Sequence, residues 1–193
     1  MKERILVTGG TGYIGSHTVV ELQNSGYDVV IVDNLSNSSA DVVDNIEKVS
    51  GIRPAFEKLD CLDLEGMDKL FTKYPGIKGI IHFAASKAVG ESVQKPLLYY
   101  RNNLVSLINL LELMPKHGVE GIIFSSSCTV YGQPDVLPVT EEAPIKKAES
   151  PYGNTKQINE EIIRDTVASG SPINAIMLRY FNPIGAHPTA LIG

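Results

Sequence analysis

Three glycines spaced three residues apart, Gly9, Gly12 and Gly15, lie between a short apolar run and an amphipathic stretch. The run Arg4–Thr8 is typical of a buried strand, and Tyr13–Ser25 is predicted to form a helix. Without a Cβ, the backbone of such a turn can approach a pyrophosphate closely, and the helix N-terminus offers free N–H groups to the anion. Because glycines also serve ordinary tight turns, the turn needs support from the rest of the chain.

That support comes from the alternation of apolar runs and amphipathic stretches along the whole chain. Further strands are predicted at Asp28–Asp33, Ala55–Leu59, Gly79–Ala84, Gly121–Ser125 and Asn174–Tyr180. Helices are predicted at Asp41–Val49 and Leu64–Lys73, from Pro96 onward, and from Pro151 to about Ser169, with 126–149 mostly loop. Strands that are nearly continuously apolar are expected when both faces of a sheet are covered. The pattern predicts an α/β fold, a doubly wound parallel sheet with strand order 3-2-1-4-5-6, in one Rossmann-like domain over residues 1–193.

The long helix predicted from Pro96 is amphipathic. Its apolar residues recur at steps of three and four, which places them on one helical face: Leu97, Tyr100, Leu104, Leu107, Leu111 and Met114. This face could cover the sheet, or it could pack against a second subunit.

The position of Asp33 at the end of the second predicted strand favours a particular ligand. It follows Gly15 by 18 residues, which is where a carboxylate accepts hydrogen bonds from an adenosine ribose. A carboxylate would also repel a 2′-phosphate, so NAD is favoured over NADP. The alternative, an ordinary turn residue at the end of a strand, has little support in this context.

Charge and cysteine content exclude several other classes. The net charge of −5 argues against a nucleic-acid partner. Cys61 and Cys128 form no CxxC pair and no zinc-binding pattern, so we expect no metal, and a reducing, cytoplasmic location. No signal peptide and no membrane-spanning run is evident.

The catalytic signal is a tyrosine and a lysine four residues apart at the start of the last helix. Tyr152 and Lys156 would share one helix face. A phenol has an ordinary pKa near 10, and a nearby ammonium and a cationic nicotinamide would both stabilise the phenolate. Ser127, at the end of a predicted strand, could hydrogen-bond a sugar hydroxyl and relay its proton to Tyr152. We interpret Ser127, Tyr152 and Lys156 as a catalytic triad. An exposed Tyr–Lys pair and a strand-capping serine are the alternatives.

Longer strings resemble the UDP-galactose 4-epimerases of the extended short-chain dehydrogenase/reductase family from end to end. They are VTGGTGYIGSHTVVEL, DNLSNSS, KAVGESVQKPLLYYRNN, FSSSCTVYG, SPYGNTK and LRYFNPIGAHP. The resemblance implies tightly held NAD, the substrates UDP-glucose and UDP-galactose, and a homodimer built from the Pro96 and Tyr152 helices. Tyr152 would take the proton of the sugar 4-OH while C4 is oxidised by NAD⁺ and then reduced from its opposite face.

The same resemblance implies a set of binding residues. Tyr13 and Ile14, with the three glycines, would contact the pyrophosphate through their backbone. Around the adenosine it places Asp33, Asn34, Asn37, Ser38, Asp60 and Cys61. Along the cofactor path and at the nicotinamide it places Phe83, Ala84, Lys87, Asn102, Tyr152, Lys156, Tyr180 and Phe181. The substrate would meet Lys87, Ser127, Tyr152 and Asn182. His82 is expected to be a hydrogen-bonded core residue rather than a ligand.

Two related activities compete with epimerisation. The family's dehydratases carry Asp-Glu, and its decarboxylases a Glu, directly after the catalytic hydroxyl residue. Cys128 and Thr129 stand there in this chain and cannot serve as that acid and base. A non-catalytic NAD-binding fragment or sensor is a further alternative, which the retained triad argues against.

Two departures from the family pattern stand out. Family members continue into a smaller C-terminal lobe that grips the nucleotide, whereas this sequence stops at Gly193. We therefore expect NAD binding with little or no epimerase activity. The smaller departure is Ser86, beside Lys87.

Overall fold

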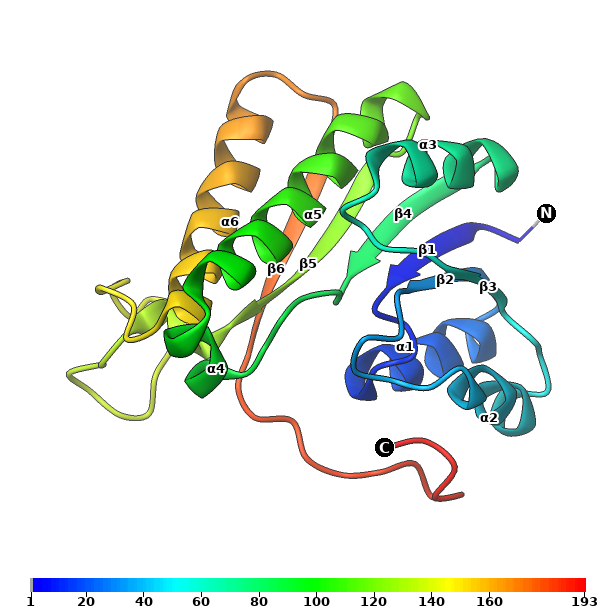
Figure 1. Cartoon of the computed structure of the whole chain (residues 1–193), viewed down its shortest axis with the longest axis horizontal. Helices are drawn as coiled ribbons and strands as arrows, with labels where there is room; N and C mark the ends of the chain where they lie inside the picture. The colour runs from blue at the N-terminus through cyan, green and yellow to red at the C-terminus, as the bar shows by residue number, and fades with distance from the viewer. Residues whose placement is uncertain (1) are drawn as a thin grey trace.

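Six parallel strands form one sheet in the computed structural model, which describes residues 2–193 (Figure 1). The strands are β1 (Arg4–Thr8), β2 (Asp28–Asp33), β3 (Ala55–Lys58), β4 (Ile77–His82), β5 (Gly121–Ser127) and β6 (Asn174–Tyr180). Their order is β3-β2-β1-β4-β5-β6, as predicted. All neighbouring strands pair in parallel.

Helices lie on both faces of the sheet, which confirms the doubly wound α/β class (Figure 1). On one face lie α1 (Tyr13–Asn24) and α2 (Asp41–Ser50). On the other lie α3 (Leu64–Lys73), α5 (Pro96–Lys116) and α6 (Pro151–Ala168), with the short α4 (Val89–Gln94) beside α6. The predictions contain no α4, since six residues are too few to show a helical period.

Strand β5 runs two residues further than predicted. Ser126 and Ser127 continue the ladder because they pair with Arg179 and Tyr180 of β6. A 3-10 helix, η1 (Cys128–Tyr131), follows at once, inside the segment predicted as loop. The extension places Ser127 at the carboxyl edge of the sheet, where ligands bind in open α/β folds.

The face of α5 that packs inward matches the predicted stripe only in part. Leu97 is 81% exposed, and Tyr100 and Leu104 are only partly buried, whereas Tyr99 and Asn103 are fully buried. The buried stripe includes the polar residues Asn103, Ser106 and Asn109, two of which hydrogen-bond across to other elements through their side chains. The second half of the predicted stripe, Leu107, Leu111 and Met114, is buried, whereas in the first turns of α5 the buried face lies about one residue away from the predicted stripe.

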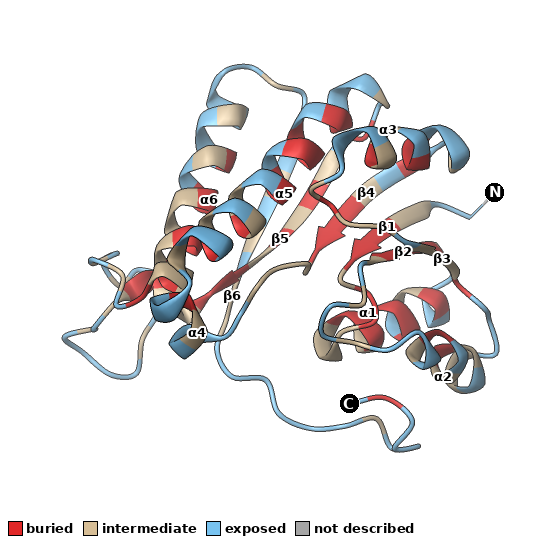
Figure 2. Cartoon of the chain, in the orientation of Figure 1, coloured by how far each residue is buried: buried red, intermediate tan, exposed pale blue. Residues whose placement is uncertain are grey.

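The second face of the sheet is only partly covered, contrary to the expectation from the apolar strands. A groove of about 800 Å³ runs along β4, β5 and β6 and extends around the β6 edge from α1 to the end of α6, and it is lined mainly by aliphatic side chains. Ile176 and Leu178 of β6 are 58% and 40% exposed there. Figure 2 shows the contrast between the buried β1 and the partly exposed β6.

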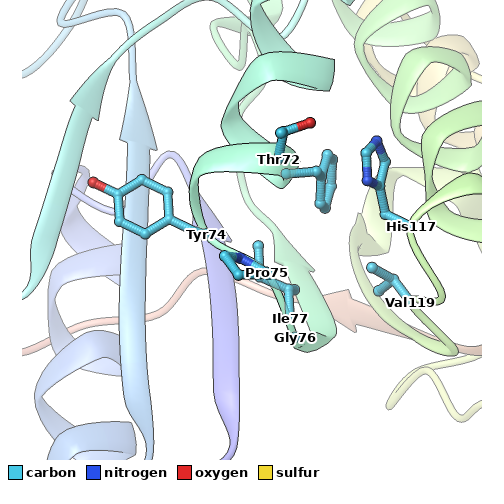
Figure 3. A pocket seen from close by; sticks show the side chains of 8 residues that line it. Thr72, Tyr74, Pro75, Gly76, Ile77, His117 and Val119 are labelled. Carbon is cyan, nitrogen blue, oxygen red and sulfur yellow. The ribbon is translucent and has the colours of Figure 1, made fainter.

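A smaller hollow of about 300 Å³ lies at the amino-terminal edge of the sheet, between the end of α3 and the end of α5 (Figure 3). Its walls include Thr72, Pro75, Ile77 and His117, and the Tyr74 ring points away from His117. This edge is opposite to the one that carries Ser127. Across residues 2–193, no helix combines the length and apolarity needed to cross a bilayer, and no cluster of three potential metal ligands occurs.

Candidate active site

The glycine turn brings the end of β1 against the start of α1. Gly9 has a φ of +70°, and a Cβ there would lie 2.7 Å from the backbone nitrogen of Ala84. A Cβ on Gly15 would lie 2.2 Å from the carbonyl oxygen of Gly9. These two glycines are therefore required by the packing of the turn against α1 and the end of β4, in addition to any ligand.

The amino terminus of α1 is open to an anion. Its N-cap residue is Gly12, which has no side chain to accept the first-turn N–H groups, and no acidic residue occupies the first turn. Asp63 and Ser150, in contrast, cap α3 and α6 with their side chains. Uncapped N–H groups and the helix dipole suit a phosphate, so the predicted pyrophosphate contact at Tyr13 and Ile14 fits this terminus.

At the end of β2, Asp33 is oriented by three neighbours. Its Oδ1 accepts hydrogen bonds from the Leu35 N–H at 2.9 Å and the Ser38 hydroxyl at 3.1 Å. Its Oδ2 faces the Thr11 N–H at 3.3 Å, and Thr11 and Ser38 join through their hydroxyls at 2.8 Å. Carboxylate oxygens hold further lone pairs, so a ribose could still bind. Thr11 was not among the predicted site residues, although it lies inside the glycine turn.

The remaining residues predicted around the adenosine lie beside Asp33. Asn34 donates to Asp60 across 2.9 Å, which joins the ends of β2 and β3. Cys61 is buried, and this burial raises the pKa of its thiol to about 12. The buried amide of Asn109 on α5 donates to the carbonyls of Cys61 and Leu62, and thus fixes this loop. Asn37 is exposed.

On the other side of the glycine turn, the segment after β4 is held by α5. The rings of Phe83 and Tyr180 lie 6.4 Å apart, so the structure brings these two predicted residues together. Asn102 donates to the Ser86 hydroxyl at 2.9 Å. The buried Asn103, which sequence reasoning missed, accepts from the Ser86 N–H at 2.8 Å and donates to the Ser86 carbonyl at 3.0 Å. No local pattern indicates Asn103, because its partners are distant in the sequence.

Asn103 also connects this segment to α6. Its amide donates to the Thr155 hydroxyl at 3.0 Å, and Thr155 donates to the Tyr152 carbonyl at 2.7 Å. His82 is buried and hydrogen-bonded to Thr8 at 2.7 Å, which confirms it as a core residue. Its burial lowers the pKa of the imidazole to about 3. The imidazole is therefore neutral near pH 7.

The carboxyl end of β5 meets the first turns of α6. Ser150 caps α6 through the Gly153 N–H, and Pro151 begins the helix, as predicted. The buried Lys156 donates to the Ser125 carbonyl at 2.7 Å. Its Nζ lies 5.8 Å from the centre of the Tyr152 ring, so helix geometry places the two side chains together.

The protonation states of this pair differ from the simplest expectation. Burial lowers the pKa of Lys156 to about 8. Burial also raises the pKa of the Tyr152 phenol, and the side-chain contact with Ser127 acts in the opposite direction. Without a cofactor, Tyr152 is therefore a neutral acid at pH 7, because desolvation outweighs the stabilisation of the phenolate. A cation bound next to it would be needed to turn it into a base.

The residues predicted at the substrate end of the site are the least enclosed. Lys87 and Asn182 are exposed, and Phe181 is 55% exposed. The segment that follows β6 turns back toward α1, where the Tyr13 hydroxyl donates to the Gly185 carbonyl at 2.7 Å. The structure thus gathers the glycine turn, Asp33, Phe83, Tyr180 and the triad along one edge of the sheet.

Comparison with known proteins identifies relatives of this chain. A model of the NAD dependent epimerase/dehydratase family matches residues 5–192. The chain is 51% identical over 191 residues to a UDP-glucose 4-epimerase of Dictyostelium discoideum and 52% identical over 189 residues to one of Bacillus subtilis. These alignments cover 99% and 98% of this chain but 55% of each relative. The chain thus spans about half the length of the relatives it matches.

Solved structures agree with the fold. UDP-glucose 4-epimerase from Bifidobacterium longum, in complex with NAD⁺ and UDP, has a TM-score of 0.96 at 47% identity, over 98% of this chain and 56% of that one. The enzyme from Stenotrophomonas maltophila, with bound NAD and formylated UDP-arabinopyranose, has a TM-score of 0.95 at 48% identity, over 99% and 56%.

Proposed function

Because the chain belongs to the NAD dependent epimerase/dehydratase family, we propose that it carries the NAD-binding and catalytic residues of a UDP-glucose 4-epimerase. One observation supports this above the others: Tyr152, Lys156 and Ser127 meet at the carboxyl end of β5, on the sheet edge that also carries the open α1 terminus and Asp33. We further propose that residues 1–193 act as one NAD-binding domain.

The residues at this edge fit NAD. The open terminus of α1 would hold the pyrophosphate, while Asp33, with the loops at Asn34 and Asp60, would hold the adenosine. Other contacts are proposed from Gly9, Gly12, Gly15, Asn37, Ser38, Cys61, Phe83, Ala84, Lys87, Asn102, Tyr180 and Phe181. Bound NAD⁺ would supply a hydride acceptor for C4 of the sugar, return the hydride to its opposite face, and place a positive charge beside Tyr152.

The chain's own residues would then move one proton. With that charge nearby, the pKa of the Tyr152 phenol falls, and the phenolate can accept the proton of the sugar 4-OH. Ser127, which contacts Tyr152, can pass this proton on or orient the hydroxyl. Lys156, fixed on the Ser125 carbonyl, holds an ammonium next to the ring. Asn182 and Lys87 would contact UDP-glucose or UDP-galactose.

A direct test is the reduction of chain-bound NAD⁺ by UDP-glucose, followed by absorbance of NADH. Tyr152→Phe should lower the rate by at least about 100-fold, since general base catalysis typically contributes this much. Tyr27→Phe, at a half-buried tyrosine far from this edge, is the matched control. A Tyr152→Phe chain that reduces its bound NAD⁺ as fast as the wild type would contradict the catalytic part of the proposal.

The oligomeric state and the cellular location are also proposals. Exposed apolar residues on the outer faces of the adjoining helices α5 and α6 (Leu98, Val105, Ile108 and Val167) would form a homodimer of four helices. Both cysteines are free thiols, which supports a reducing, cytoplasmic location. A role in galactose metabolism follows from the proposed interconversion of UDP-glucose and UDP-galactose. Sedimentation at several concentrations tests the dimer, and Ile108→Asp should yield monomers.

A further inference from the structure

A buried carboxylate that takes no part in the proposed chemistry lies directly behind the triad. Glu160 of α6 has a side chain that is 1% exposed. Its Oε1 accepts hydrogen bonds from the Ser126 hydroxyl at 2.6 Å and from Arg179 Nε at 2.9 Å. Its Oε2 accepts from Arg179 Nη2 at 2.8 Å and from Arg164 Nη2 at 2.5 Å. Both carboxylate oxygens thus accept hydrogen bonds, which come from three neighbouring residues.

These partners come from the strand ends that carry the site. Ser126 of β5 and Arg179 of β6 lie opposite each other in the ladder, one step before the pair of Ser127 and Tyr180. The Arg179 guanidinium also lies 4.8 Å from the centre of the Tyr131 ring in η1, the short helix that follows Ser127. One carboxylate therefore joins α6, β5, β6 and, through Arg179, η1.

On α6, Glu160 continues the line of Tyr152 and Lys156. The three residues are spaced by four, so they lie on one face over successive turns. Lys156 attaches this face to the Ser125 carbonyl, and Glu160 attaches it to the next residue of the same strand, Ser126. These two hydrogen bonds to adjacent residues of β5 restrain α6 against sliding or rotation relative to Ser127. Glutamine at 160 would keep the shape but leave the guanidinium groups without their counter-ion.

We propose that Glu160 is a positioning residue: its buried carboxylate fixes α6 against the ends of β5 and β6, and so sets the placement of Tyr152 relative to Ser127 and Lys156. This rests on the proposed role of Tyr152 as the base. The ionised form is supported by the pKa of Glu160, which burial raises but the hydrogen bonds from Arg179 and Ser126 bring below its usual value.

The readout is the ionisation of the Tyr152 phenol in the NAD⁺-bound chain. Phenolate absorbance is titrated in each background with and without Tyr152→Phe, and the difference isolates this single tyrosine. Glu160→Gln should raise the midpoint by about one pH unit, because a displaced phenol lies farther from the ammonium of Lys156. Loss of the Glu160 charge would by itself lower the midpoint, so a raised midpoint reports the displacement. The rate of NADH formation from UDP-glucose should fall through kcat rather than KM.

A second variant separates positioning from stability. Glu160→Gln combined with Arg179→Met removes the unpaired charge, so its melting temperature should recover toward that of the wild type. If the Tyr152 midpoint stays raised while stability recovers, positioning is supported. If the midpoint returns to the wild-type value together with stability, Glu160 is only a structural ion pair and the proposal is wrong. If Glu160→Gln alone does not fold, the Tyr152 midpoint of the double variant still tests the proposal.

The control is Leu70→Ala, on the buried face of α3, which destabilises without touching this edge. It should leave the Tyr152 midpoint unchanged, and an equal shift there would overturn the proposal. Failure of the proposed function would look different. A Tyr152→Phe chain that forms NADH as fast as the wild type would contradict the role of Tyr152 in epimerisation, while the Tyr152 titrations would still decide what Glu160 does.

Discussion

The buried ammonium of Lys156 should lower the free energy of unfolding of the chain, by an amount that depends on pH. Its ammonium is buried, and its pKa is lowered from 10.5 to about 8. At about 1.4 kcal/mol per pKa unit, burying this charge costs the folded state about 3 kcal/mol. The change to test is Lys156→Met, which keeps the length of the side chain and removes the charge.

The expected gain is smaller than the full burial cost. Methionine loses the hydrogen bond to the Ser125 carbonyl, worth about 1 kcal/mol, and the contact with the Phe124 ring at 4.8 Å, worth about 0.5–1 kcal/mol. A net stabilisation of about 1–2 kcal/mol remains at pH 7, which raises the melting temperature by about 2–8 °C. The same variant should be inactive in the NADH assay.

The sign with pH follows from the lowered pKa. Below pH 8 both the folded and the unfolded chain hold the proton, so the full cost is present. Between pH 8 and 10.5 the folded chain releases the proton first, and the wild type therefore gains stability with rising pH relative to the variant. The advantage of Lys156→Met should disappear by about pH 10.5.

Thermal unfolding by circular dichroism at pH 7, 9 and 10.5 measures this difference. Lys147→Met, at an exposed loop lysine, is the matched control and should change stability by less than about 0.5 kcal/mol at each pH. A Lys156→Met chain that is less stable than the wild type at pH 7, with a gap that does not vary with pH, would refute the reasoning.

Three further predictions concern the turn, the ribose site and the open sheet face. Gly15→Ala should destabilise by about 3 kcal/mol or more in chemical unfolding, because its Cβ would lie 2.2 Å from the Gly9 carbonyl oxygen; Gly90→Ala, with open space around it, should be neutral or slightly stabilising. Asp33→Ala should weaken NAD⁺ binding about 10- to 100-fold in calorimetry, and unchanged affinity would remove Asp33 from the site. Ile176→Ser with Leu178→Ser should reduce the fluorescence of a bound apolar dye while changing stability little, since both side chains are already exposed.

Much of the fold could be read from local patterns. The strand, glycine turn and helix at the start of the chain, and the four-residue spacing of Tyr152 and Lys156, depend on neighbours within one or two turns. Periodicity predicted the element order and the strand order for the same reason. It was misleading for the first turns of α5, because Asn103 is buried with hydrogen-bonded partners that lie far away in the sequence.

The site shows the same division. The triad and Asp33 carry recognisable spacings, whereas Asn103 has no local signal, since its partners at Ser86 and Thr155 lie 17 and 52 residues away. The raised pKa of the Tyr152 phenol also could not be read from the sequence. Spacing predicts that Lys156 lies near the ring, but only packing determines how strongly burial raises the pKa of the phenol.

The amino-acid sequence by itself therefore determined the chemical groups and their local arrangement: a phosphate-binding turn, a carboxylate after the second strand, and a phenol beside an amine on one helix. Tertiary structure decided what those groups can do. The pairing of Ser126 with Arg179 depends on the register of two strands, and the burial of Glu160 and Lys156 depends on how α6 lies over them. Charge in a protein interior is controlled by contacts between distant segments, and no local pattern encodes those contacts.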